Sequence, residues 1–217
     1  YFGVNVVSHE WDSSTNKGII TFNGHVTTVA GFMDCYNLTS IYLPDCVTSI
    51  GSEAFMDSGL KEIVIPESVT SIGSNAFYEC NLTSIIIPKN VVSIGYHAFY
   101  HCYSLVDLYS YAILPPILSE NAFVSCPKNV HVYEESLNLY QSSWSSIFNY
   151  VSLGNIPADT PTTSIYYTTS DGATTTSRRF VVKSNLYSGD SGDLVVYGEL
   201  LFIPESAFSY NNTLTSI

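Results

Sequence analysis

The chain has 217 residues, of which 46% are hydrophobic and only 12% are charged. Seven basic residues stand against 19 acidic ones, giving a net charge of −12. This balance disfavours binding to nucleic acid or to anionic lipid, because both need clustered Lys and Arg. No apolar run reaches the roughly 18 residues that would span a bilayer, so no direct insertion of this sequence into a membrane is expected.

The first 37 residues predict a β-rich cap and an irregular first coil. Strand-like stretches occur between residues 2 and 29, and Asn23-Gly24 is a strong hairpin signal. The segment 12–18, DSSTNKG, has the composition of a second turn between strands. Residues 26–35 are two residues shorter than the corresponding part of the next unit, so the first coil is expected to be irregular.

From residue 38 the sequence repeats with a period of 22 residues. The shared pattern is L-x-x-I-x-(I/L)-P-x-x-V-x-S-I-G-x-x-A-F-x-x-(C/S), and it extends to residue 126. A fourth, weaker unit begins at Leu105 and lacks the Pro and Gly of the pattern. The repeated phenylalanines are Phe55, Phe77, Phe99 and Phe123.

Each unit combines a short strand with a return path. The alternation of apolar residues before each Pro predicts the strand, and the Pro ends its pairing because it has no amide proton. The V-x-S-I-G-x-x-A-F part predicts a turn and a short helical or irregular return. One unit cannot bury its own apolar side chains, whereas stacked units share a continuous core. The sequence therefore predicts a solenoid with one parallel strand per unit.

The repeated pattern resembles a known family of leucine-rich repeats. The marks are IP…VTSIG…AF…C at 63–80 and 85–102, which resemble the BspA-like class found in surface proteins of gut and oral bacteria and of some protozoa. The resemblance covers roughly residues 1–153. It implies an α/β leucine-rich-repeat solenoid, mostly β with short helical or irregular return segments, flanked by β-hairpin and strand-helix caps. It also implies a location at the bacterial cell surface or outside the cell.

Residues 127–178 are interpreted as a closing cap and a linker. In 127–153, NVHVY predicts a strand, and apolar residues at helical spacing then predict an amphipathic helix. These residues are Leu137, Tyr140, Trp144, Ile147 and Phe148. The Thr-rich segment 154–178 predicts a linker with a possible hairpin at Asp171-Gly172.

Residues 179–217 parallel residues 1–41 and predict the start of a second cap and repeat array. The segment ends in LTSI, the letters that open a repeat at 38–41 and 82–85. We therefore expect a truncated array, stabilised by contact with the first array or by association with a neighbouring chain.

Three groups of residues resemble chemical sites. Cys35, Cys80, Cys102 and Cys126 occupy one repeat position, which favours a ladder of small buried thiols over disulfides because stacked side chains point the same way. His97 and His101 are four residues apart and Cys102 follows directly, but the two histidines occupy positions held elsewhere by Glu, Asp or Asn, so we interpret them as surface histidines and predict no metal site. The SGDSGD stretch at 188–193 resembles a protease nucleophile loop, but its composition suits a turn.

The outward-facing strand positions form the candidate site. They should make two rows across the coils, and one of them is apolar in all four units. An exposed apolar row on a solenoid sheet suggests a protein-binding surface, although the β-propensity of Tyr, Val and Ile would also explain it. The rows are Tyr42, Val64, Ile86 and Tyr109, and Ser40, Glu62, Ser84 and Asp107.

The leading hypothesis is a non-enzymatic recognition and adhesion module that binds an extracellular or host protein and needs no cofactor. The family resemblance implies adhesion to host matrix proteins. A structural spacer that displays another domain is the alternative. Carbohydrate binding stays open because of the 17 Tyr, and an enzymatic role would require residues outside this sequence.

Overall fold

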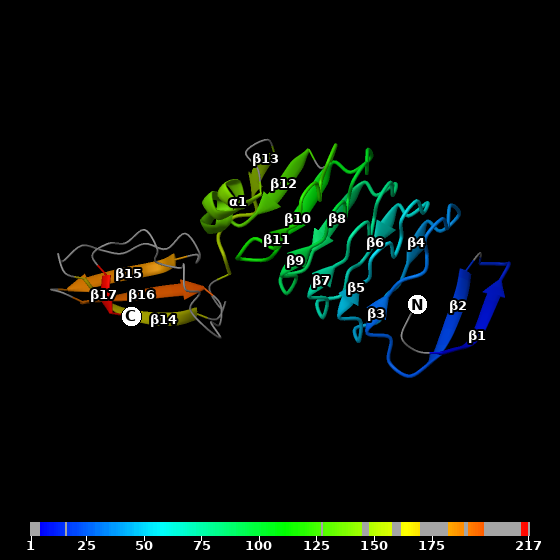
Figure 1. Cartoon of the computed structure of the whole chain (residues 1–217), viewed down its shortest axis with the longest axis horizontal. Coiled ribbons are helices and arrows are strands. Elements are labelled where there is room, and N and C mark those ends of the chain that lie inside the picture. The colour runs from blue at the N-terminus through cyan, green and yellow to red at the C-terminus, as the bar shows by residue number, and fades with distance from the viewer. Residues whose placement is uncertain are drawn as a thin grey trace. The chain divides into compact units, whose positions relative to one another are not determined.

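The structure is a computed structural model that describes residues 5–15, 17–126, 128–144, 148–157, 162–169, 182–188, 191–197 and 214–216. The chain forms two compact units. The first comprises Tyr1–Ala112 and Pro116–His131, and the second comprises Ile113–Pro115 and Val132–Ile217. Figure 1 shows the stacked coils that make up most of the first unit.

The first unit opens with an antiparallel hairpin of β1 (Asn5–Asp12) and β2 (Lys17–Asn23). The predicted turn in DSSTNKG is confirmed. The Asp12 carboxylate accepts hydrogen bonds from the Ser14 amide at 2.8 Å and from the Ser14 and Thr15 hydroxyls at 2.6 and 2.7 Å. These three bonds lower the pKa of Asp12 to about 2. The hairpin prediction at Asn23-Gly24 is wrong, because the chain beyond Gly24 enters the first coil instead of pairing back on β2.

One parallel sheet is built from the V-T-S-I part of successive repeats. Its order is β11-β9-β7-β5-β3, and equivalent residues pair directly, as Ser49 does with Ser71 and Ile50 with Ile72. Every Ile or Val of this row from β3 to β9 is buried. The strands are β3 (Thr28–Val29), β5 (Ser49–Ile50), β7 (Ser71–Ile72), β9 (Ser93–Ile94) and β11 (Ile117–Leu118).

The strands before each Pro form the second run of parallel pairs. Here β4 pairs with β6, and β10 pairs with β8 on one side and β12 on the other. Their alternation of buried and exposed residues, such as Ile85 and Ile87 inside with Ile86 outside, is the predicted one. The strands are β4 (Ser40–Ile41), β6 (Glu62–Ile63), β8 (Ser84–Ile87), β10 (Asp107–Ser110) and β12 (Asn129–Val132).

The return path places a continuous stack of phenylalanine rings in the core. Neighbouring ring centroids lie 5.0–5.4 Å apart with interplanar angles of 9–15°. The predicted repeat positions of Phe55, Phe77, Phe99 and Phe123 are thereby confirmed. The stack also contains Phe32, because the Phe of the shortened first coil still packs on Phe55. The stacked rings are Phe32, Phe55, Phe77, Phe99 and Phe123.

The second unit begins with a strand-helix element. After β12, a 3-10 turn (Glu134–Ser136) leads into α1 (Leu137–Ser143), and β13 (Asn149–Ser152) follows. Tyr140 is fully buried, and its carbonyl accepts a hydrogen bond from the Tyr150 hydroxyl at 3.1 Å. The helix is shorter than predicted, since Phe148 precedes β13 instead of lying on α1.

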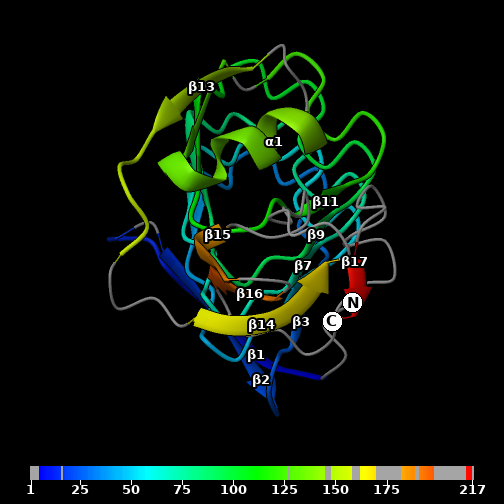
Figure 2. The ribbon, with the colours of Figure 1, turned by 90° about the vertical axis from the view of Figure 1, so that its left-hand side faces the viewer.

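The rest of the second unit contains a four-stranded antiparallel sheet in the order β15-β16-β14-β17 (Figure 2). Its strands are β14 (Thr162–Thr169), β15 (Val182–Ser188), β16 (Ser191–Tyr197) and β17 (Leu214–Ser216). β15 pairs antiparallel with β16 up to Ser188–Ser191, and the two residues between them, where SGDSGD predicts a turn, lie outside the described residues. The possible hairpin at 171–172 lies outside the described residues.

The terminal LTSI forms β17 and not the first strand of a parallel coil. Its Leu214 and Ser216 pair antiparallel with Thr169 and Thr168 of β14. The described strand is therefore paired within the second unit, and stabilisation of residues 179–217 by the first array or by a neighbouring chain stays a prediction.

Candidate functional site

Two rows of residues cross the outward face of the strands before each Pro. We name the apolar row of Tyr42, Val64, Ile86 and Tyr109 the strand-face stripe, and its neighbour of Ser40, Glu62, Ser84 and Asp107 the polar row. Tyr42, Val64 and Ile86 are 82%, 77% and 50% exposed, whereas Tyr109 is half-buried. Ser40 pairs directly with Glu62 in one sheet, and Ser84 with Asp107 and Ile86 with Tyr109 in another, so these neighbours within the rows are in register.

Both rows continue by one coil into a hydrogen-bonded cluster on β12. Asp107 pairs with Asn129 and Tyr109 with His131. The Asp107 Oδ1 atom accepts a hydrogen bond from Asn129 Nδ2 at 2.9 Å and lies 2.8 Å from His131 Nε2. The His131 ring stacks on Tyr109, with centroids 4.2 Å apart. The bond with His131 first, and that from Asn129 second, lower the pKa of Asp107.

Asn129 and His131 are members of these rows that were not predicted from the sequence. Each lies 22 residues after its neighbour in the row, which is the period of the repeat. The repeat period therefore predicts both positions when NVHVY is aligned with the preceding units. Its interpretation as part of the cap hid this alignment. The candidate surface thus runs from an exposed apolar end to a partly buried polar end.

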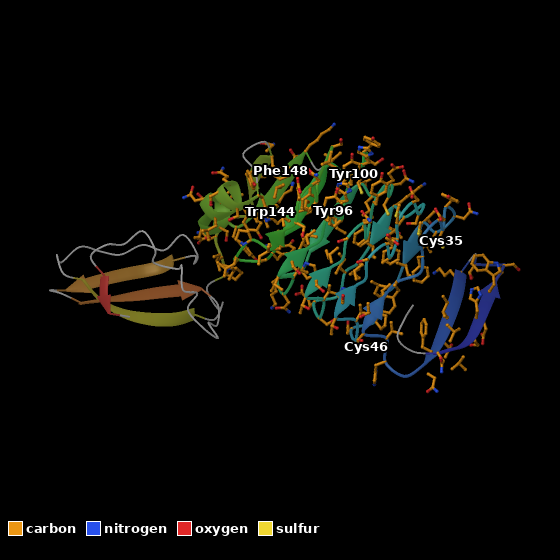
Figure 3. The ribbon with its side chains drawn as sticks, viewed as in Figure 1. Cys35, Cys46, Tyr96, Tyr100, Trp144 and Phe148 are labelled. Carbon is orange, nitrogen blue, oxygen red and sulfur yellow. The ribbon has the colours of Figure 1, made fainter. Side chains whose placement is uncertain are left out.

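The return path carries a cluster of stacked tyrosine and histidine rings. The ring centroid of His97 lies 3.7 Å from that of Tyr96 and 4.2 Å from that of Tyr100. The His101 centroid lies 3.9 Å from that of Tyr100 and 4.9 Å from that of Tyr103. Figure 3 labels Tyr96 and Tyr100. Both histidines are half-buried, so they are more enclosed than the surface positions that were predicted. The described residues contain no group of three or more His, Cys, Asp or Glu that could hold a metal ion.

The predicted ladder of small buried side chains follows the phenylalanine stack, except that Cys35, which was predicted to belong to it, is only half-buried. Each thiol of Cys80, Cys102 and Cys126 donates a hydrogen bond to the carbonyl of a phenylalanine in the preceding coil, at 2.8–3.0 Å. Burial raises the pKa of Cys80 to about 11. Ser58 occupies the ladder position of its coil, and its hydroxyl lies 3.5 Å from the sulfur of Cys80. These contacts give the cysteines a structural role in packing.

A sequence model described as a BspA type leucine rich repeat region matches residues 28–150 in six copies. This match covers more than half of the chain. The protein belongs to the BspA-type leucine-rich repeat family. The strand-face stripe and the phenylalanine stack lie within the matched region. No curated protein matches the chain.

Several solved structures are similar to this BspA-type chain over part of their length. A leucine-rich cell surface protein of Faecalibacterium prausnitzii is 26% identical, with a TM-score of 0.38, over 48% of this chain and 38% of its own. A leucine-rich repeat protein of Eubacterium ventriosum is 27% identical, with a TM-score of 0.39, over 54% and 33%. The pneumococcal vaccine antigen PcpA is 24% identical, with a TM-score of 0.46, over 58% and 39%.

The BspA-type chain thus covers 33–39% of the length of these three proteins. One of them is described as a cell surface protein. Within the part of the chain that the structure describes, no helix is long and apolar enough to cross a membrane.

Proposed function

We propose that this BspA-type module is a non-enzymatic recognition domain at the bacterial cell surface that binds an extracellular or host protein through the strand-face stripe. The observation that supports the proposal is the exposure of Tyr42, Val64 and Ile86 in consecutive coils. These large apolar side chains occupy one repeat position in successive coils, and exposed apolar patches on monomers mark interaction surfaces.

The parallel register supports a preformed binding surface. Each stripe residue belongs to a coil whose buried face is fixed by the phenylalanine stack, so binding would not require the strands to become ordered first. The polar row and the Asp107–Asn129–His131 cluster flank the stripe with hydrogen-bonding groups. An apolar centre beside a polar border is the usual anatomy of a protein interface.

The test compares two double variants against a panel of purified host extracellular-matrix proteins. Y42S/V64S removes the exposed end of the stripe. Y103S/V92S is the matched control, because Tyr103 and Val92 are 67% and 63% exposed on other parts of the coils. Surface plasmon resonance should show micromolar or tighter capture of at least one protein by the wild type. We expect Y42S/V64S to weaken that affinity at least about tenfold, or about 1.4 kcal/mol, and the control to retain it.

Equal loss in both variants would contradict the stripe as the binding surface. Capture of no protein at micromolar concentration would favour the spacer alternative, and retention on immobilised glycans alone would favour carbohydrate binding. Circular dichroism and thermal unfolding of both variants serve as the folding control.

A further inference from the structure

The carboxylate of Asp107 is held in place on the outward face of β10. Asn129 Nδ2 donates a hydrogen bond to its Oδ1 atom at 2.9 Å, and His131 Nε2 lies 2.8 Å from the same oxygen. The His131 ring is itself stacked on Tyr109, two residues further along β10. The carboxylate is therefore oriented before any partner arrives, which reduces the conformational entropy that is lost on binding.

The same two contacts leave the second carboxylate oxygen able to accept further hydrogen bonds. Both of them come from β12 and end on Oδ1, whereas Oδ2 keeps its accepting capacity. The Asp107 side chain is 31% exposed, so a donor can approach it from outside. The contact with His131 first, and that with Asn129 second, lower the pKa of Asp107, which keeps this carboxylate charged at neutral pH and in weak acid.

The surroundings of Asp107 combine negative charge with apolar surface. The strand-face stripe, the polar row and their extension on β12 contain two carboxylates, those of Glu62 and Asp107, and no Lys or Arg. On the β8 side, Ser84 pairs directly with Asp107, and Ile86, which pairs with Tyr109, is 50% exposed (Figure 1). This part of the surface is complementary to a positive charge that carries apolar groups beside it.

We propose that Asp107 binds an arginine side chain of the protein that the strand-face stripe recognises, an inference that rests on the function proposed above. The guanidinium group donates to Oδ2, and the apolar residues that flank the arginine lie on Ile86 and Tyr109. Arginine fits better than lysine, because its planar guanidinium group matches a carboxylate, stacks on aromatic rings and is more weakly hydrated than an ammonium group.

The experiment titrates the full chain, labelled with 15N, with the peptide acetyl-Leu-Arg-Leu-amide at millimolar concentrations and follows the backbone amides by NMR. Saturable shifts should appear at residues 107–110 and 129–132. The same peptide with citrulline in place of arginine keeps the shape of the side chain but has no charge, and it should bind about fivefold more weakly. The lysine peptide should also bind more weakly than the arginine peptide.

Two variants locate the binding of the arginine peptide on the protein. Asp107→Asn keeps a carbonyl oxygen for Asn129 and His131 but removes the charge, so it should lower the affinity about fivefold. Glu67→Gln is the matched control, because Glu67 is an exposed carboxylate in the turn after β6 and outside both rows, and it should leave the affinity unchanged. Circular dichroism checks that both variants are folded, and the citrulline comparison on the wild type needs neither of them.

Equal binding of the arginine and citrulline peptides would overturn the proposal, as would full affinity in Asp107→Asn or shifts confined to other parts of the coils. Equal binding of the arginine and lysine peptides would overturn the assignment to arginine. Arginine-selective shifts without capture of any protein from the matrix panel would support this site and contradict the proposed function. Capture that is lost in Y42S/V64S, without any selectivity among the peptides, would do the reverse.

Discussion

The conformations that shape each return path belong to non-glycine residues with positive φ. Two repeat positions adopt this geometry, those of Glu53 and Asp57, and the amides of these two residues donate to carbonyls of the next coil, Glu53 to Ser74 at 2.8 Å and Asp57 to Tyr78 at 2.9 Å. The left-handed conformation costs a non-glycine residue about 1–2 kcal/mol. The residues are Asp34, Glu53, Asp57, Asn75, Glu79, His97, His101, Asn121 and Ser125.

Glu53→Gly should therefore stabilise the protein. Glu53 has a φ of 57° and an exposed side chain, so glycine removes the conformational cost without losing buried contacts. After allowing for the greater freedom of glycine in the unfolded chain, the free energy of unfolding should rise by about 0.5–1 kcal/mol. Urea unfolding measures this change through the midpoint at constant m-value.

The neighbouring Ser52→Gly variant is the control for this substitution. Ser52 is also exposed, but it is not among the described residues with positive φ. Glycine there adds freedom to the unfolded chain and relieves no strain, so stability should fall. A loss of stability in both variants would contradict the role assigned to the left-handed conformation.

At the level of elements, a row of glycines allows successive coils of the first sheet to approach closely. A Cβ atom on Gly73 would lie 2.5 Å from the Ser52 nitrogen and 2.6 Å from the Gly51 carbonyl carbon. A Cβ atom on Gly95 would meet the coil before it at 2.5 and 2.7 Å. Both obstacles are backbone atoms, which cannot rotate away as a side chain can.

Gly73→Ala should accordingly destabilise the first unit by about 3 kcal/mol, since the clash must be relieved by moving a coil. Ser74→Ala, one residue away and half-buried, is the control and should change stability by much less. Thermal and urea unfolding of both variants check this prediction. An alanine at 73 that leaves the midpoint unchanged would show that the coils are less tightly stacked than the structure indicates.

The period of the repeat explains which elements the sequence predicts correctly. Stacking places residues 22 apart on one another, so the buried phenylalanines, the thiol ladder and the outward rows all follow from alignment alone. Phe32 was missed because two residues are lost before it, and the alignment breaks there although the ring still joins the stack. The left-handed positions were missed because Glu, Asp and His give no sequence signal for positive φ.

Elements outside the repeat were predicted less well for a different reason. Asn23-Gly24 has the strongest hairpin composition, yet Asp12 fixes the turn through three hydrogen bonds that composition does not reveal. The pairing of β14 with β16 and β17 is antiparallel and distant in sequence, and no periodicity indicates it. Thr-rich strands also resemble linkers, because their hydroxyl side chains suit both.

At the scale of the whole molecule, acidic charge is poorly balanced. The net charge is −12, and the ion pairs among the described residues are His101–Glu79 and His131–Asp107, both of which require a protonated histidine. On the return path, burial first, and the carboxylates of Glu79 and Asp34 second, raise the pKa of Asp57. Like charges in consecutive coils therefore oppose the stacking that holds the solenoid together.

Moderate salt should therefore stabilise this protein. Raising NaCl from 10 to 150 mM shortens the Debye length from about 30 Å to about 8 Å, which screens repulsion between coils. We expect the free energy of unfolding to rise by about 1 kcal/mol over this range, measured by urea unfolding at pH 7.

Asp57→Asn should be more stable than the wild type at 10 mM NaCl, because the side chain of residue 57 then carries no charge for the neighbouring carboxylates to repel. Asn also tolerates the φ of 54° at this position. For the same reason the free energy of unfolding of the variant should increase less on addition of salt. A wild-type stability that falls with salt, or an identical salt response in the variant, would contradict the charge argument.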